Sequence, residues 1–207
     1  IYNQETGEFH LYNDGISYIM KILRNGQMGQ LYFGKKVPAE QSYSYLEEHT
    51  KRSTLSEVYE NQYGFSLEQI RQEYPSYGTT DYRLPAVEIA QENGSRITNF
   101  TYVSHRIYAG KPGLPGLPAT YVEKDQEADT LEILLRDELI GVEMTLLYTI
   151  FAEENAVARS VKFRNYKNEK LQIETAMSLS LDLPDADYDW IQFSGAWSRE
   201  RHVKERR

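Results

Sequence analysis

Apolar and polar residues alternate over positions 171–183, and this alternation constrains the fold more than any other feature of the chain. Every second residue of the stretch is apolar or threonine: Leu171, Ile173, Thr175, Met177, Leu179, Leu181 and Leu183. Successive side chains of a β-strand point to opposite faces, whereas a helix would spread these positions around its circumference. We therefore expect a strand here, with one face against a core.

The same period recurs elsewhere, most clearly between positions 141 and 151. One face of that segment carries five apolar or aromatic residues, Val142, Met144, Leu146, Tyr148 and Ile150. Shorter runs predict strands over 130–135, 160–164 and 102–108. The chain also holds 17 tyrosines among its 207 residues, and tyrosine is favoured in strands.

Turn sequences separate these runs and predict how the strands connect. Asn13-Asp14-Gly15, Asn25-Gly26 and Asn93-Gly94 each lie between apolar runs and are typical of tight hairpins. Residues 165–170 predict a longer, polar hairpin loop. Short strands joined by such turns favour an all-β, antiparallel sandwich over a parallel α/β sheet.

Three segments depart from the strand pattern. Ser66 and Gln69 have the spacing of a helix capping box, so we expect one short helix at residues 66–72. Residues 41–63 are polar, rich in tyrosine and without a clear period, which predicts a long surface loop of the kind that is functional or disordered. Residues 110–118 hold too much proline and glycine for a helix or a ladder of strands.

Composition excludes several classes of protein. The chain has 23 Lys and Arg against 31 Asp and Glu, a formal net charge of −8, which argues against tracking a nucleic-acid backbone. It contains no cysteine, so it holds no disulfide, no thiolate nucleophile and no Cys-ligated zinc. The missing cysteines fit a reducing compartment, and we expect a cytoplasmic protein. No apolar run approaches the ~20 residues that cross a bilayer, so we expect no membrane contact.

Metal binding finds little support in the sequence. Asp185, Asp187 and Asp189 resemble the start of a calcium loop, but Trp190 and Ala196 stand where that loop requires Gly and Glu. An acidic turn, or a loop facing a partner or a sugar, are the alternatives. The histidines lack metal-site spacing; they are His10, His49, His105 and His202. We expect no metal, and a packed or hydrogen-bonded role for His105.

Two aromatic segments are candidates for binding. Trp197 follows Gly195 and Ala196, so its ring has room to present a face to a sugar, although a core tryptophan is at least as consistent with the sequence. Around Asp81 and Arg83, aromatic residues alternate with turn formers. There we favour a surface ion pair between these two residues over a structured aromatic loop.

Six stretches together resemble one known family across nearly the whole chain: the N-terminal domain of bacterial α-galactosidases, the melibiose- and raffinose-cleaving enzymes of glycoside hydrolase family 36. The stretches are FHLYNDGISYIM (Phe9–Met20), LYFGKKV (Leu31–Val37), EYPSYGTTDYRLPA (Glu73–Ala86), SHRIYAGKPGLPGLPATYVE (Ser104–Glu123), EADTLEI (Glu127–Ile133) and DADYDWIQFSGAWSRER (Asp185–Arg201).

The resemblance implies an antiparallel β-supersandwich of the galactose-mutarotase type over residues 1–207, incomplete at its end. It further implies a catalytic (β/α)8 barrel and a C-terminal β domain that this chain does not contain. Both catalytic carboxylates of a retaining glycosidase would lie in that barrel, so we expect no catalytic residue here and no activity from the chain alone. No cofactor is expected.

Substrate contacts carry over residue by residue. Trp197 matches the family's GAW tryptophan, which lies at the substrate. The family also uses an Asp upstream of the EYP motif, where this chain departs from the pattern with Thr50 or Lys51. A Lys or Arg there could still hydrogen-bond a sugar hydroxyl, so Lys51 and Arg52 are candidate sugar ligands.

Our main hypothesis is part of an α-galactosidase that hydrolyses terminal α-linked D-galactose with retention, from substrates such as melibiose and raffinose. The segment would assist assembly of a homotetramer and shape the substrate pocket, against the barrel of its own and a neighbouring subunit. The alternative is a stand-alone carbohydrate-binding or structural interface module.

Overall fold

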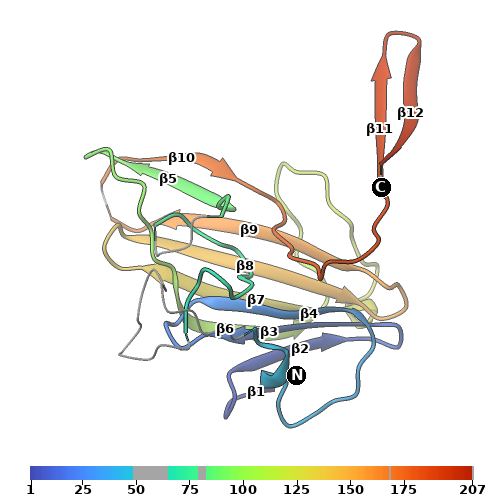
Figure 1. The fold of residues 1–207 in the computed structure, drawn as a ribbon, viewed down its shortest axis with the longest axis horizontal. Coiled ribbons are helices and arrows are strands. Elements are labelled where there is room, and N and C mark those ends of the chain that lie inside the picture. Colours follow the sequence, from blue (N-terminus) through green and yellow to red (C-terminus); the bar gives the residue numbers. More distant parts are fainter. Residues whose placement is uncertain (49–64, 79–82, 168, 207) are drawn as a thin grey trace.

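Two four-stranded antiparallel sheets form the body of the protein (Figure 1). The coordinates are a computed structural model that describes residues 1–48, 65–78, 83–167 and 169–206. The first sheet contains, in spatial order, β1 (Tyr2–Asn3), β2 (Glu8–Tyr12), β3 (Ile16–Ile22) and β4 (Met28–Lys35). The second contains β6 (Thr101–Ala109), β7 (Ala128–Asp137), β8 (Val142–Phe151) and β9 (Val157–Asn165).

Two strand pairs complete the described fold. One joins β5 (Val87–Gln91) to β10 (Leu171–Ala176), and the other joins β11 (Trp190–Ala196) to β12 (Arg199–Arg206). The described helical turns are η1 (Ser44–Leu46) and η2 (Asp125–Glu127), both 3₁₀. The prediction of an all-β, antiparallel sandwich is confirmed. Within the described residues, no helix is long and apolar enough to cross a bilayer.

The core lies between the inner faces of the two large sheets. The face predicted for residues 141–151 is buried along its whole length, and Tyr148 at its centre has no exposed surface. The strands predicted at 130–135 and 160–164 are present but longer, as β7 and β9. The hairpin turns at residues 13–15 and 25–26 connect β2 to β3 and β3 to β4 as predicted.

The helix predicted at residues 66–72 is wrong, because this segment forms a turn. The Gln69 amide donates to the Ser66 carbonyl, which closes one turn, and no helix follows it in residues 70–72. Instead the Arg71 carbonyl accepts from the Gln30 amide, and the Glu73 amide donates to the Met28 carbonyl, so residues 71–73 lie along β4. Bonds to a sheet outweigh a single capping signal, since one helical turn is unfavourable by itself.

Three connections also differ from the predictions. The alternating segment 171–183 is a strand only to Ala176, and residues 177–189 have neither helix nor strand. Residues 165–170 form no hairpin loop, because β9 and β10 belong to different sheets. The turn at Asn93-Gly94 closes no hairpin either, since β5 pairs with β10. Alternation and turn residues are local, but the extent and the pairing of a strand depend on distant partners.

A buried carboxylate ties the two large sheets together. Glu73 is fully buried, and each of its carboxylate oxygens accepts the Tyr18 hydroxyl at 2.8 Å, from β3. From the other sheet, the Tyr148 hydroxyl of β8 donates to Oε1 at 2.7 Å. The Arg159 guanidinium of β9 lies 2.7 Å from the same oxygen. Three strands from two sheets thus meet at one carboxylate.

The charges of this cluster are balanced within the core. Burial raises the pKa of the Glu73 carboxyl, and Arg159 together with the Tyr148 and Tyr18 hydroxyls opposes that effect. Burial also raises the pKa of both tyrosines well above the ordinary value, so they remain donors. A buried charge is tolerated only when paired and hydrogen-bonded, which is the arrangement here.

Replacing the carboxylate with an amide tests this account. Glu73→Gln keeps the size of the side chain but leaves the Arg159 charge buried without its counterion, which should lower the free energy of unfolding by roughly 3 kcal/mol or more. Glu132→Gln is the control, because Glu132 pairs with the exposed Arg106, and we expect under about 1 kcal/mol there. Urea denaturation followed by circular dichroism measures both; equal losses would contradict the prediction.

Candidate functional site

The β11–β12 hairpin projects away from the two large sheets (Figure 1). Its strands pair from Trp190 opposite Arg206 to Ala196 opposite Arg199, with a bulge beside Gly195. A Cβ on Gly195 would lie 3.2 Å from the Cα of Glu200, so the close approach of the strands favours glycine there.

Trp197 lies in the turn of this hairpin and is 94% exposed. Its ring therefore does not belong to the core, and the interpretation as a core tryptophan is wrong. An exposed indole offers a flat apolar face together with one N–H donor, a combination suited to the C–H patches and hydroxyls of a sugar. Contact of Trp197 with a substrate stays a prediction.

The rest of the hairpin also exposes large hydrophobic side chains. They are Trp190, Ile191, Phe193 and Val203. An isolated two-stranded hairpin is marginally stable in water, and clustered exposed apolar residues mark interaction surfaces. The hairpin therefore has the character of an arm that packs on a partner.

The segment before residue 49 is held firmly against the first sheet. The buried carboxylate of Glu8 accepts hydrogen bonds from the Ser42 hydroxyl at 3.0 Å, the Tyr43 amide at 2.9 Å and the Ser44 hydroxyl at 3.1 Å. Such bonds fix the loop around the short η1 turn. The predicted ligands Lys51 and Arg52 lie outside the described residues.

His10 provides a second anchor for this segment. Its Nδ1 lies 2.9 Å from the Tyr43 hydroxyl, and its Nε2 lies 2.8 Å from the Ser17 hydroxyl. The Tyr43 hydroxyl donates to the Pro38 carbonyl at 2.8 Å. A neutral ring protonated on Nδ1 satisfies all three contacts, with Ser17 donating to Nε2. A charged ring would lose that acceptor.

The electrostatic surroundings of His10 agree with a neutral ring. Burial, followed by the positive amine of residue 1 and the Lys36 ammonium, lowers the pKa of His10 to about 4. His105 is different in kind: its Nδ1 lies 2.8 Å from the Tyr102 hydroxyl, and its ring contacts Tyr2 and Phe9. The packed and hydrogen-bonded role predicted for His105 is confirmed.

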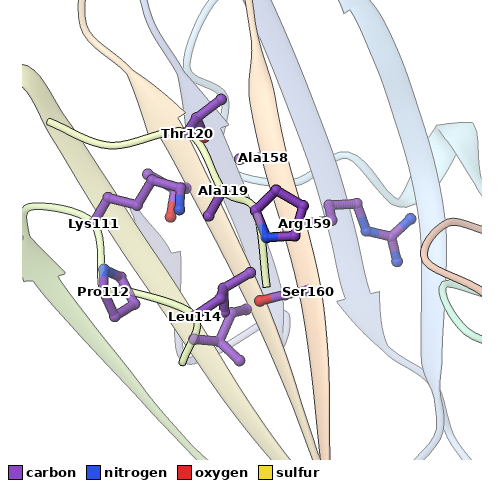
Figure 2. A pocket seen from close by; sticks show the side chains of 11 residues that line it. Lys111, Pro112, Leu114, Ala119, Thr120, Ala158, Arg159 and Ser160 are labelled. Carbon is purple, nitrogen blue, oxygen red and sulfur yellow. The ribbon is translucent and has the colours of Figure 1, made fainter. Parts of the chain in front are cut away.

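A hollow of about 260 Å³ lies between residues 111–120 and the outer face of β8 and β9 (Figure 2). Pro112 and Leu114 line one wall and Ser160 another, while the side chain of Arg159 points away from the hollow toward the core. None of the lining residues is a carboxylate or a histidine. This hollow therefore offers no pair of groups for acid–base chemistry.

Acidic residues gather into no metal site in the part of the chain that the structure describes. Asp185, Asp187 and Asp189 are exposed in the connection before β11, and no group of three potential ligands gathers among the described residues. The fully buried Glu73 is sealed from any substrate. Arg83 pairs with Asp182, at 3.0 Å. Asp81 lies outside the described residues, so its predicted surface pair with Arg83 stays a prediction.

Sequence reasoning missed the anchoring residues Glu8, His10, Glu73 and Arg159. Their only signal is a polar residue within a buried stretch, as in the EFHLY sequence of β2, whose first four residues are buried. A buried polar residue indicates that it has a hydrogen-bond partner, but the sequence does not identify that partner.

Comparison with known proteins gives a consistent result. The model of the glycosyl hydrolase family 36 N-terminal domain matches residues 26–207. Alpha-galactosidase AgaA of Geobacillus stearothermophilus is 46% identical over 99% of the chain, and alpha-galactosidase Mel36A of Lactobacillus acidophilus is 33% identical over 98%. In both comparisons the chain spans 28% of the relative's length.

Solved structures of similar proteins have the same fold. The α-galactosidase from Lactobacillus brevis superposes with a TM-score of 0.93 at 40% identity, over 99% of this chain and 28% of that one. A variant of AgaA from Geobacillus stearothermophilus, solved in complex with raffinose, gives 0.89 at 46% identity, over 96% and 28%.

The buried His10 predicts a specific dependence of stability on pH. Its folded pKa of about 4 lies below the ordinary 6.5, so its contribution is complete above pH 6.5 and is lost as the pH falls toward 4. We expect the free energy of unfolding to decline by about 2–3 kcal/mol over this window. His10→Gln should flatten the decline between pH 6.5 and 5, before most carboxylates titrate. His202→Gln, at an exposed position of β12, should leave it intact; equal slopes in wild type and His10→Gln would refute the assignment.

Proposed function

The chain belongs to glycosyl hydrolase family 36, as its N-terminal domain, and from this we propose that it is part of an α-galactosidase. The enzyme would hydrolyse terminal α-linked D-galactose from galactosides and oligosaccharides such as melibiose and raffinose. Support comes from the relatives named as α-galactosidases and from the raffinose complex of one of them. Because the chain spans 28% of the relatives' length, we assign the catalytic step to segments outside it.

The chemistry we propose is hydrolysis with retention of configuration. That mechanism needs two carboxyl groups about 5 Å apart on either side of the glycosidic bond, one as nucleophile and one as acid and base. We assign both to a (β/α)8 barrel outside this chain, which a C-terminal β domain would follow. Carboxylate chemistry requires neither metal nor organic cofactor. We further propose a cytoplasmic location, as the absence of cysteine suggests.

The chain's own contribution is to shape the substrate pocket and to support assembly of a homotetramer. The observation that carries this proposal is the 94% exposed Trp197 at the end of the projecting hairpin. In that position an indole can form one wall of a sugar site on the barrel of its own or a neighbouring subunit. Lys51 and Arg52 would donate hydrogen bonds to sugar hydroxyls.

A structural interface module, without a role at the substrate, is the second candidate function. The exposed apolar residues along the hairpin favour it, namely Trp190, Ile191, Phe193 and Val203. An arm of this composition would stabilise an assembly even if Trp197 never met a sugar. A stand-alone carbohydrate-binding module, without a catalytic domain, would bind a sugar through Trp197.

Truncating the indole in the full-length enzyme separates these functions. Trp197→Ala should raise KM for raffinose about tenfold, by loss of a stacking face worth about 1.4 kcal/mol, and Trp197→Phe should restore most of it. Tyr121→Ala, at a 79% exposed aromatic residue outside the hairpin, is the matched control. Sedimentation velocity reports the oligomer. Unchanged KM with a broken oligomer in Trp197→Ala would favour the interface module instead.

The isolated 207-residue chain should be inactive, because we assign both catalytic carboxylates elsewhere. The measurement is release of nitrophenol from an aryl α-galactoside, with the full-length enzyme as positive control. Turnover by the pure chain would contradict the assignment.

A further inference from the structure

The connection from β10 to β11 is held in place by side chains from other parts of the fold. Residues 177–189 have no helix or strand. At the start of this connection the Tyr74 hydroxyl donates to the Met177 carbonyl at 2.5 Å. Arg159 then donates to the Ser180 carbonyl at 2.9 Å, and Arg83 donates to the Asp182 carboxylate at 3.0 Å. Three donors thus fix the course of residues 177–182.

Arg83 connects residues 177–182 to a second segment of the chain. Besides Asp182, its guanidinium donates through Nη2 to the carbonyls of Leu67 at 2.8 Å and Ile70 at 2.7 Å. The side chains of Leu67 and Ile70 are buried in a small apolar cluster, so these carbonyls form a rigid support. A planar guanidinium can serve several acceptors in fixed directions at once, which a lysine ammonium does less well.

Arg83 contacts two segments that adjoin, in sequence, the residues that we propose for the substrate pocket. Asp182 is half-buried, whereas every residue from 183 to 190 is exposed. The pair therefore lies where the chain leaves the body toward β11 and Trp197. On its other side, Arg83 holds residues 67–70, which follow the segment that carries Lys51 and Arg52.

We propose that Arg83, through its bond to Asp182, is a positioning residue of the α-galactoside site, which fixes the point where the chain leaves the body toward the β11–β12 hairpin and so restricts the place of Trp197. The inference rests on the proposed function. A general stabilising role explains the pair less well. Both side chains are partly exposed, at 25% and 44%, and ion pairs of this exposure contribute little to stability. Their effect should therefore appear in substrate binding.

The test uses the full-length enzyme and one variant of each member of the pair. Asp182→Asn removes the charge of the carboxylate and keeps the shape of the side chain. Arg83→Lys keeps the positive charge and removes the planar guanidinium with its several donors. Each should raise KM for raffinose about three- to tenfold, with kcat within about twofold and a nearly unchanged melting temperature. Glu132→Gln is the matched control, since Glu132 accepts two hydrogen bonds from Arg106 between β6 and β7, away from this connection, and its KM should equal that of wild type.

A double-variant comparison shows whether the pair acts through the indole. In a Trp197→Ala background, Asp182→Asn should raise KM no further, because the residue that it positions is already gone. An equal increase in both backgrounds, or an unchanged KM in Asp182→Asn, would overturn the inference. If Arg83→Lys lowers the melting temperature strongly, Asp182→Asn still decides. An unchanged KM in Trp197→Ala alone would refute the proposed role of the indole itself, a different failure.

Discussion

The ion pair between Glu73 and Arg159 is the interaction on which the described fold depends. Its two charges lie in the core, and two tyrosine hydroxyls from opposite sheets complete the hydrogen bonds of the carboxylate. In a medium of low dielectric constant, each of these groups would be costly without the others. The pair therefore specifies one relative placement of β3, β8, β9 and the segment after residue 65, whereas apolar contacts alone tolerate small shifts.

The same cluster connects the core to the parts of the chain that we propose for function. Arg159 reaches from the Glu73 carboxylate to the Ser180 carbonyl, and Tyr74, next in sequence, reaches the Met177 carbonyl. The connection toward β11 thus takes its course from the core. A rigid sandwich that holds irregular segments at its edge is a common way to carry binding residues, since loops can vary while the support stays constant.

The outcome at two segments shows what limits prediction from a sequence. Residues 66–72 have the spacing of a helix capping box. However, β4 hydrogen-bonds to the backbone of residues 71 and 73, and the Arg83 guanidinium donates to the Leu67 and Ile70 carbonyls, which a helix would use for its own bonds. Residues 171–183 alternate throughout, but Tyr74 and Arg159 hold the chain beyond Ala176 through single carbonyls instead of a ladder. In both, backbone and side-chain groups distant in sequence replaced the expected backbone bonds.

The sequence by itself determined the all-β class, the four strands of the second sheet, the first two hairpins and membership of the family, because alternation, turn residues and long motifs are local properties of the chain. Only the tertiary structure decided that Trp197 is exposed at the end of an arm, that Arg83 pairs with Asp182, and that Glu73 is sealed in the core. Burial and pairing depend on which distant segments meet, and no local pattern encodes the identity of a distant partner.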